Sequence, residues 1–228
     1  MCVGSVPLQA QESSQEGWGG RLGFNVGFNY SFLGQPADQP GDVTVLAGSA
    51  FSGVGFAASA TYEVVGLGVP WLGLESGLAY ASSSATGFEI QGDRQREILI
   101  EATSIRLPLY AKGRWSPTQT LGLSFGLGPE VAFGLSSAST VRERNIPQEE
   151  AQALRTTSVT ALLLTAMVGA ELDAGPVSFP LRVHASFNPF VGDTTADRSA
   201  GVEGGQVLDY RMEFNFEMLF TIGVAYSL

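Results

Sequence analysis

Apolar and polar residues alternate one by one along several segments of the chain, most clearly in the closing segment. From Leu208 to Leu228 nearly every second residue is large and apolar, while the residues between them are mostly polar or small. Such alternation is typical of a β-strand with two unlike faces. About twenty residues exceed the usual strand length of roughly 3–10. The length suits a tilted strand that crosses a membrane and continues beyond it.

Seven further segments carry the same alternation. Residues 21–32 and 121–135 repeat it clearly, and it is less regular at 50–64, 71–82, 99–115, 158–172 and 177–188. Within 99–115 the apolar residues change from even to odd positions between Ile100 and Ile105. This change predicts a β-bulge near Ala102.

The connections between these eight predicted strands alternate in length. The short ones lie near 66–70, 116–119 and 173–176, and the long ones near 34–49, 83–98, 137–157 and 189–207. Short turns at one end and long loops at the other are typical of outer-membrane barrels, whose short turns face the periplasm. The sequence therefore predicts an all-β fold, an eight-stranded antiparallel up-and-down transmembrane β-barrel over 21–228, with both termini periplasmic. Residues 1–20 are interpreted as a tail or a signal-peptide remnant.

The two strand faces differ in a way that separates membrane barrels from soluble ones. One face carries Phe, Leu, Val and Tyr with almost no charge, and the other mixes Gly, Ser, Asn and Thr with acids and bases. This pattern indicates a barrel that is apolar outside and polar inside. The residues expected to face lipid are Phe24, Phe28, Leu123, Phe125, Phe216, Phe220, Ile222 and Val224. Aromatic residues at predicted strand ends are girdle candidates: Tyr30, Trp71, Tyr80 and Trp115.

Composition supports this interpretation and excludes other classes. Charged residues make up 15% of the chain, and the net charge is −10. A nucleic-acid partner is not expected, because binding phosphates needs a basic patch. The single Cys2 excludes an internal disulfide, and the sequence predicts neither a metal site nor a cofactor.

Two segments resemble a known family. Leu107, Pro108, Leu109 and Lys112 are followed by Gly126, Gly128 and Pro129, which together resemble strand motifs of the small outer-membrane β-barrel domain family. The resemblance covers roughly 21–228. One departure is Leu228, which stands where the closing strand usually ends in Phe. Members of this family mostly lack an assigned activity, so the resemblance implies location and fold but no chemistry.

The inward-facing charged residues are the most distinctive candidates for a site. An eight-stranded interior is nearly filled by side chains, and ions there must be paired to offset desolvation. We expect a lumen charge network in which Arg106 and Glu130, and likewise Arg182 and Glu217, lie at similar heights on adjacent strands. Its predicted members are Glu63, Glu75, Arg106, Lys112, Arg114, Glu130, Glu171, Arg182, His184 and Glu217. The inward glycines leave open a gated conduit or a small-solute site.

One short motif resembles an enzyme family. His184 and Ser186 form a His-x-Ser pair similar to that of lipid A deacylases, in which the histidine is the base that activates the serine. In that family the pair faces lipid, whereas strand parity here places both residues inside, so no catalytic residue is expected.

The sequence thus predicts a non-enzymatic outer-membrane barrel with a structural, anchoring or surface-interaction role. A narrow channel for small solutes, or a lipid A-type hydrolase using His184 and Ser186, are the alternatives. The expected partners are outer-membrane lipid, the barrel-assembly machinery during biogenesis, and an envelope protein that binds through the loops or the periplasmic turns.

Overall fold

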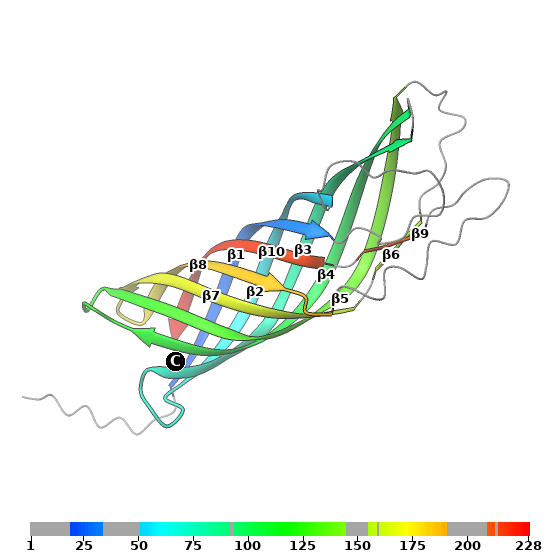
Figure 1. Ribbon diagram of the computed structural model, residues 1–228. Coiled ribbons are helices and arrows are strands. Elements are labelled where there is room, and N and C mark those ends of the chain that lie inside the picture. The colour runs from blue at the N-terminus through cyan, green and yellow to red at the C-terminus, as the bar shows by residue number, and fades with distance from the viewer. Residues whose placement is uncertain are drawn as a thin grey trace, which may run out of the picture.

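The computed structural model describes residues 19–33, 51–91, 94–144, 155–158, 160–190, 209–212 and 214–228. Eight strands form a closed barrel (Figure 1). Their bounds are β1 Gly19–Leu33, β2 Phe51–Val65, β3 Leu72–Gln91, β4 Arg94–Trp115, β5 Leu121–Arg144, β7 Ala161–Ala174, β8 Val177–Phe187 and β10 Phe214–Ser227. The predicted eight-stranded antiparallel up-and-down barrel is therefore confirmed.

Each barrel strand pairs antiparallel with its neighbours along the chain, and β1 closes the barrel against β10. At this seam the N–H of Leu228 donates to the carbonyl of Gly20 at 2.8 Å. The connection between β7 and β8 is a two-residue turn, in which Gly175 adopts φ 68°, a conformation that favours glycine. The C-terminus lies at the same end of the barrel as the short turns (Figure 1).

Side chains alternate between lumen and exterior as the period-two pattern requires. On β7, for example, buried Ala161, Leu163 and Thr165 alternate with exposed Leu162, Leu164 and Ala166. The described residues contain no helix long and apolar enough to cross a membrane.

Strands β3, β4 and β5 extend beyond their neighbours at the end opposite the short turns (Figure 1). Pairing between β2 and β3 ends at Ser52 and Thr86, and β5–β7 pairing ends at Ala132 and Ala161. Pairing of β4 with both of its neighbours continues further, to Gln91↔Arg94 on β3 and to Gln95↔Arg144 on β5. We call residues 87–91, 94–100 and 137–144 of these strands the β3–β5 extension.

The β3–β5 extension corrects the prediction of long loops at 83–98 and 137–157. Much of this sequence is polar, for example Ser82–Ser84 and Ser136–Ser137, and polar runs without apolar alternation are typical of loops. A backbone ladder needs no apolar face, however, and opposite charges occupy paired positions here. Arg96 is opposite Glu89 on β3 and Glu143 on β5, a pairing that favours a sheet. The predicted loop at 34–49 and most of the one at 189–207 lie outside the described residues.

The bulge predicted near Ala102 is assigned to the wrong strand. The register of β4 against β3 has no shift, and Ile100 is buried with the same parity as Arg106. The shift occurs between β4 and β5, where Thr103 pairs with Ser136 but Ser104 pairs with Gly134, so Leu135 is the extra residue. The change of apolar parity on β4 therefore reflects an apolar residue inside the barrel rather than a bulge.

Two short strands form a separate two-stranded parallel sheet, β6 Arg155–Ser158 and β9 Asp209–Met212. The prediction of one unbroken strand over 208–228 is therefore wrong, because the barrel strand begins at Phe214. The alternation continues through both β9 and β10. Alternation alone does not show that β9 pairs with β6 whereas β10 pairs with β1 and β8.

Candidate functional site: the ion-paired lumen

The inside of the barrel carries a concentrated set of buried charged residues. Nine of the ten predicted lumen residues are buried, and Arg114 is half-buried. All of them except His184 are brought together as two separate groups, one at the short-turn end and one toward the extension.

The first group, the short-turn cluster, is centred on Lys112. Its ammonium Nζ lies 2.7 Å from Glu63, 2.9 Å from Glu75 and 3.5 Å from Glu171. The cluster comprises Arg21, Glu63, Glu75, Lys112, Arg114, Glu171, Asp173 and Arg182 from β1, β2, β3, β4, β7 and β8. Because these strands lie around most of the barrel, the cluster spans its interior at this level.

Three arginines surround the lysine and share its carboxylates. Arg21 lies 3.0 Å from Glu171 and 3.4 Å from Glu63, and it also donates to Ser178. Arg182 lies 2.8 Å from Glu75. At the mouth, Arg114 donates to Asp173 at 2.6 Å. Four bases thus face four acids, which offsets the desolvation that buried charges would otherwise suffer.

The second group, the Arg106 centre, has a different composition. The guanidinium of Arg106 donates to both carboxylate oxygens of Glu217, from Nη2 at 2.8 Å, and its Nη1 lies 3.2 Å from Glu130. Tyr110 donates its hydroxyl proton to Glu130. Asn29 and Ser31 donate to Glu217 at 3.2 and 2.8 Å. Two carboxylates here share one arginine among the described residues, and neutral donors satisfy their remaining oxygens.

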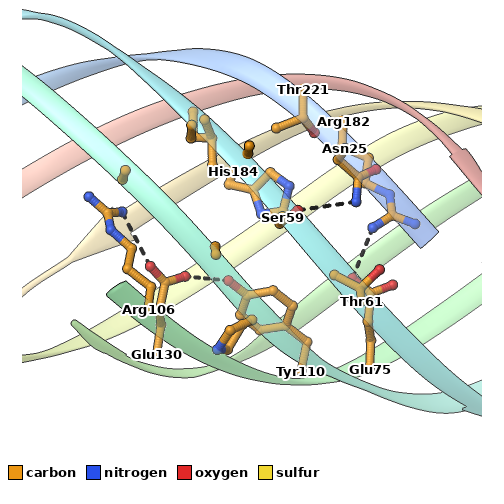
Figure 2. Close-up of a pocket in the computed structure, with 16 residues that line it drawn as sticks. Asn25, Ser59, Thr61, Glu75, Arg106, Tyr110, Glu130, Arg182, His184 and Thr221 are labelled. Carbon is orange, nitrogen blue, oxygen red and sulfur yellow. Dashed lines mark hydrogen bonds and ion pairs between the residues drawn. The ribbon is translucent and has the colours of Figure 1, made fainter. Parts of the chain in front are cut away.

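A cavity of about 40 Å³ separates the two groups. Figure 2 shows Arg106, Glu130 and Tyr110 on one side of it, and Asn25, Arg182, His184 and Thr221 on the other. The alanines Ala57, Ala79 and Ala81 also line the cavity. This volume accepts a few waters and is far below the roughly 300–1,000 Å³ of typical small-molecule sites.

The expected neighbourhood of Arg182 and Glu217 is wrong. Arg182 pairs in register with Thr221, whereas Glu217 pairs with Ser186, four residues further along the strand. Arg182 consequently binds Glu75 in the short-turn cluster, and Glu217 binds Arg106. Arg182 therefore lies closer to the short turns than predicted, because the register and tilt of neighbouring strands set the relative heights of their residues. Arg106 and Glu130, in contrast, are in contact as expected.

Sequence reasoning missed the neutral donors Asn29 and Ser31 and three further members of the two groups. Arg21 has the same parity as the inward Asn25 and Asn29, but it was passed over at the beginning of its strand. Asp173 lies at the end of β7 and was assigned to a turn. Tyr110 is an aromatic residue at an inward position. Parity alone identifies all three as inward-facing.

The structure places His184 and Ser186 in the lumen, where each has a different neighbour. Both are buried inside the barrel. The Ser186 hydroxyl is 2.9 Å from that of Thr165, and among the described residues no hydrogen bond joins it to the imidazole. His184 lies instead beside Tyr110, with ring centroids 6.1 Å apart. A histidine base must reach the hydroxyl that it activates, so this arrangement does not prepare Ser186 as a nucleophile.

The outer wall of the barrel carries the residues expected to face lipid and those expected in the girdles. Phe24, Phe28, Leu123, Phe125, Ile222 and Val224 are exposed, as are Tyr30, Trp71, Tyr80 and Trp115. Phe216 and Phe220 are half-buried because they pack against β1. Phe220 stacks on Phe28 with ring centroids 5.1 Å apart, and Phe216 lies 6.0 Å from Phe32.

Within the described residues no group of three or more His, Cys, Asp or Glu side chains could hold a metal ion. The carboxylates of the lumen are instead held by arginine and lysine.

No family model matches this chain, and no curated protein sequence matches it. Similar solved structures include Neisserial surface protein A, with 9% identity over 91% of this chain and 96% of that chain and a TM-score of 0.41. Another is Ail, the attachment invasion locus protein of Yersinia pestis, in complex with the heparin analogue sucrose octasulfate, with 10% identity, 92% and 99% coverage and a TM-score of 0.38. A third is the outer membrane protein OprG from Pseudomonas aeruginosa, with 12% identity, 92% and 97% coverage and a TM-score of 0.36. At such values these likenesses support no conclusion about what this chain does.

Proposed function

We propose that this chain is an integral outer-membrane β-barrel with a closed lumen, serving a structural, anchoring or surface-interaction role. The observation that carries the proposal is the exposed apolar band around a barrel whose ions are buried. On β4 the outward residues from Trp115 to Ile105 are apolar or small, whereas the next two outward residues are Thr103 and Glu101. Ten strand residues at about 3.3 Å each, tilted by roughly 40°, span about 25 Å, the height of the apolar band in outer-membrane barrels.

Aromatic residues at both edges of this band support the same placement. Trp71 and Trp115 lie at the short-turn edge, and Tyr30 and Tyr80 lie toward the opposite edge. Tyrosine and tryptophan favour the interface between lipid and water. With short turns toward the periplasm, the C-terminus is periplasmic and the β3–β5 extension faces outward. Outer-membrane lipid and the barrel-assembly machinery are then the obligatory partners.

The filled interior supports an anchoring role over a channel. The short-turn cluster and the Arg106 centre lie in series along the lumen, and both are made of buried, mutually bonded side chains. A solute would have to break several charge-assisted hydrogen bonds, each contributing about 1.5–3 kcal/mol. We therefore expect no conductance in planar bilayers. Steady single-channel currents from purified protein would favour the narrow-channel alternative instead.

The β3–β5 extension supports the surface-interaction role. It continues past the apolar band as a three-stranded sheet, with Arg96 and Glu97 on β4 opposite residues of the other sign on β5. A sheet that continues beyond the bilayer offers backbone for contact with an envelope protein or a surface ligand.

Membrane placement is tested by a pair of adjacent substitutions on β10. Phe220 points outward against Phe28, whereas its neighbour Thr221 points into the lumen. An arginine on the lipid face at mid-bilayer costs roughly 2–4 kcal/mol, so Phe220→Arg should impair folding into vesicles in a manner that varies with lipid chain length. Thr221→Arg is the matched control, and any overpacking defect that it causes should not vary with chain length. Equal defects without thickness dependence would contradict the membrane assignment.

A simpler experiment examines the closed barrel itself. We expect the detergent-solubilised protein to migrate faster on a gel when unboiled, because a barrel whose strand edges are all paired resists unfolding by detergent. Identical migration before and after boiling would argue against a closed barrel.

A further inference from the structure

We propose that the cavity between the short-turn cluster and the Arg106 centre is an internal water site, holding about two or three molecules bound to Asn25, Arg182 and Thr221. This site is independent of the membrane role proposed above, because it depends only on the interior of the barrel.

The first argument is the set of polar atoms that lack partners. Asn25 Oδ1, Arg182 Nε and Thr221 Oγ1 are buried without a hydrogen-bond partner among the described residues, and their residues are 5%, 3% and 6% exposed. Buried polar side-chain atoms are nearly always bonded to protein or to ordered water. Leaving such an atom unbonded costs about 1–3 kcal/mol. Three of them at one cavity indicate a ligand that both donates and accepts hydrogen bonds.

The second argument is that these atoms lie close together and are held in place. Thr221 and Arg182 are directly paired across β10 and β8, and Asn25 lies on β1, the other neighbour of β10. The amide nitrogen of Asn25 donates to Ser59 Oγ at 3.2 Å, which leaves Oδ1 as the amide atom that can accept a further bond. All three residues line the cavity, and Figure 2 shows them on one side of it.

Size and charge then identify the ligand. A volume of about 40 Å³ holds up to about three waters, since one needs roughly 10–15 Å³ by the same measure. The charges on the wall are already paired, Glu75 with Arg182 at 2.8 Å and Glu130 with Arg106 at 3.2 Å. A neutral polar molecule therefore fits better than an ion. An apolar cavity of this size would stay dry, but polar side chains line this cavity on both sides.

Nuclear magnetic resonance of the full chain in detergent micelles can detect such water directly. We expect cross-relaxation between water and the methyl groups of Ala57 and Ala81, which line the cavity and carry no exchangeable side-chain protons. The methyl group of Ala85 is buried but does not line the cavity, so it serves as the control and should show none. Absence of water cross-peaks at both lining methyl groups would overturn the proposal.

A matched pair of substitutions gives a second test. A hydrated cavity and a dry cavity predict changes of opposite sign in the urea midpoint of unfolding. In a hydrated cavity Thr221→Val removes a hydroxyl that bonds water, so the urea midpoint of unfolding should fall. In a dry cavity the same change removes an unsatisfied hydroxyl, so the midpoint should rise. Thr165→Val is the control and should lower the midpoint in either case, because that hydroxyl is bonded to Ser186. A raised midpoint for Thr221→Val would contradict the water site; if that variant does not fold, the methyl cross-peaks of the unmodified chain decide.

Discussion

The short-turn cluster and the Arg106 centre are both buried ionic groups in one barrel, yet their charges are shared in opposite ways. In the short-turn cluster Glu63 and Glu75 each contact two cations, and Glu171 contacts four. In the Arg106 centre two carboxylates depend on one arginine among the described residues. Neutral donors from Tyr110, Asn29 and Ser31 complete that site.

This difference predicts how each group responds to the loss of one member. Removing one partner of a buried ion pair is strongly destabilising, because the other charge stays buried without compensation. Where each carboxylate contacts several cations, removal of one cation leaves every such carboxylate with another partner. The short-turn cluster should therefore tolerate single substitutions better than the Arg106 centre.

The largest expected effect is that of Arg106→Ala. Glu130 and Glu217 would remain buried without their arginine, so the free energy of unfolding should fall by about 3–5 kcal/mol. Urea unfolding in detergent measures this change. Adding Glu130→Ala should restore part of the lost stability; if the two effects simply add, the residues are not coupled.

Lys112→Met should have the next largest effect and lower the free energy of unfolding by about 2–3 kcal/mol. The substitution removes three charge-assisted contacts of Lys112, but Arg21 still pairs with Glu63, and Arg182 still pairs with Glu75. The comparison depends on the ranking: if Lys112→Met destabilises the barrel more than Arg106→Ala in the same assay, sharing of cations does not protect the cluster.

Tyr110→Phe tests the neutral donors of the Arg106 centre. It removes only the hydroxyl that donates to Glu130 and should cost about 1.5 kcal/mol, because a carboxylate oxygen loses its partner. The effect should largely disappear when Glu130→Ala is already present. An unchanged effect in that background would show that the hydroxyl acts through another contact.

The smallest effect is expected at the mouth of the lumen. Asp173→Asn weakens a pair in which the side chains of Arg114 and Asp173 are 22% and 21% exposed. Partly solvated pairs contribute about 0–1 kcal/mol and are screened by salt. The unfolding midpoints of Asp173→Asn and the unmodified chain should therefore converge as ionic strength rises, whereas the defect of Arg106→Ala should persist.

The sequence by itself determined which residues face the lumen and which face outward. Period-two alternation assigns Phe24, Phe28, Lys112 and Glu171 to their faces without any knowledge of the partner strands, because side-chain direction along a strand is a local property. Alternation together with the lengths of the connections also predicted the closed eight-stranded antiparallel barrel.

Only the tertiary structure decided which charges meet and where the strands end. Arg182 binds Glu75 rather than approaching Glu217, because the register and tilt of neighbouring strands set the relative heights of residues far apart in sequence. The β3–β5 extension was not predicted, because much of its sequence is polar and a backbone ladder forms without an apolar face. The change of apolar positions on β4 predicted a bulge in that strand, and only the pairing with β3 and β5 shows that β4 is regular and that Ile100 lies inside. Heights, partners and strand ends depend on contacts between strands, and a pattern read along one strand carries no information about them.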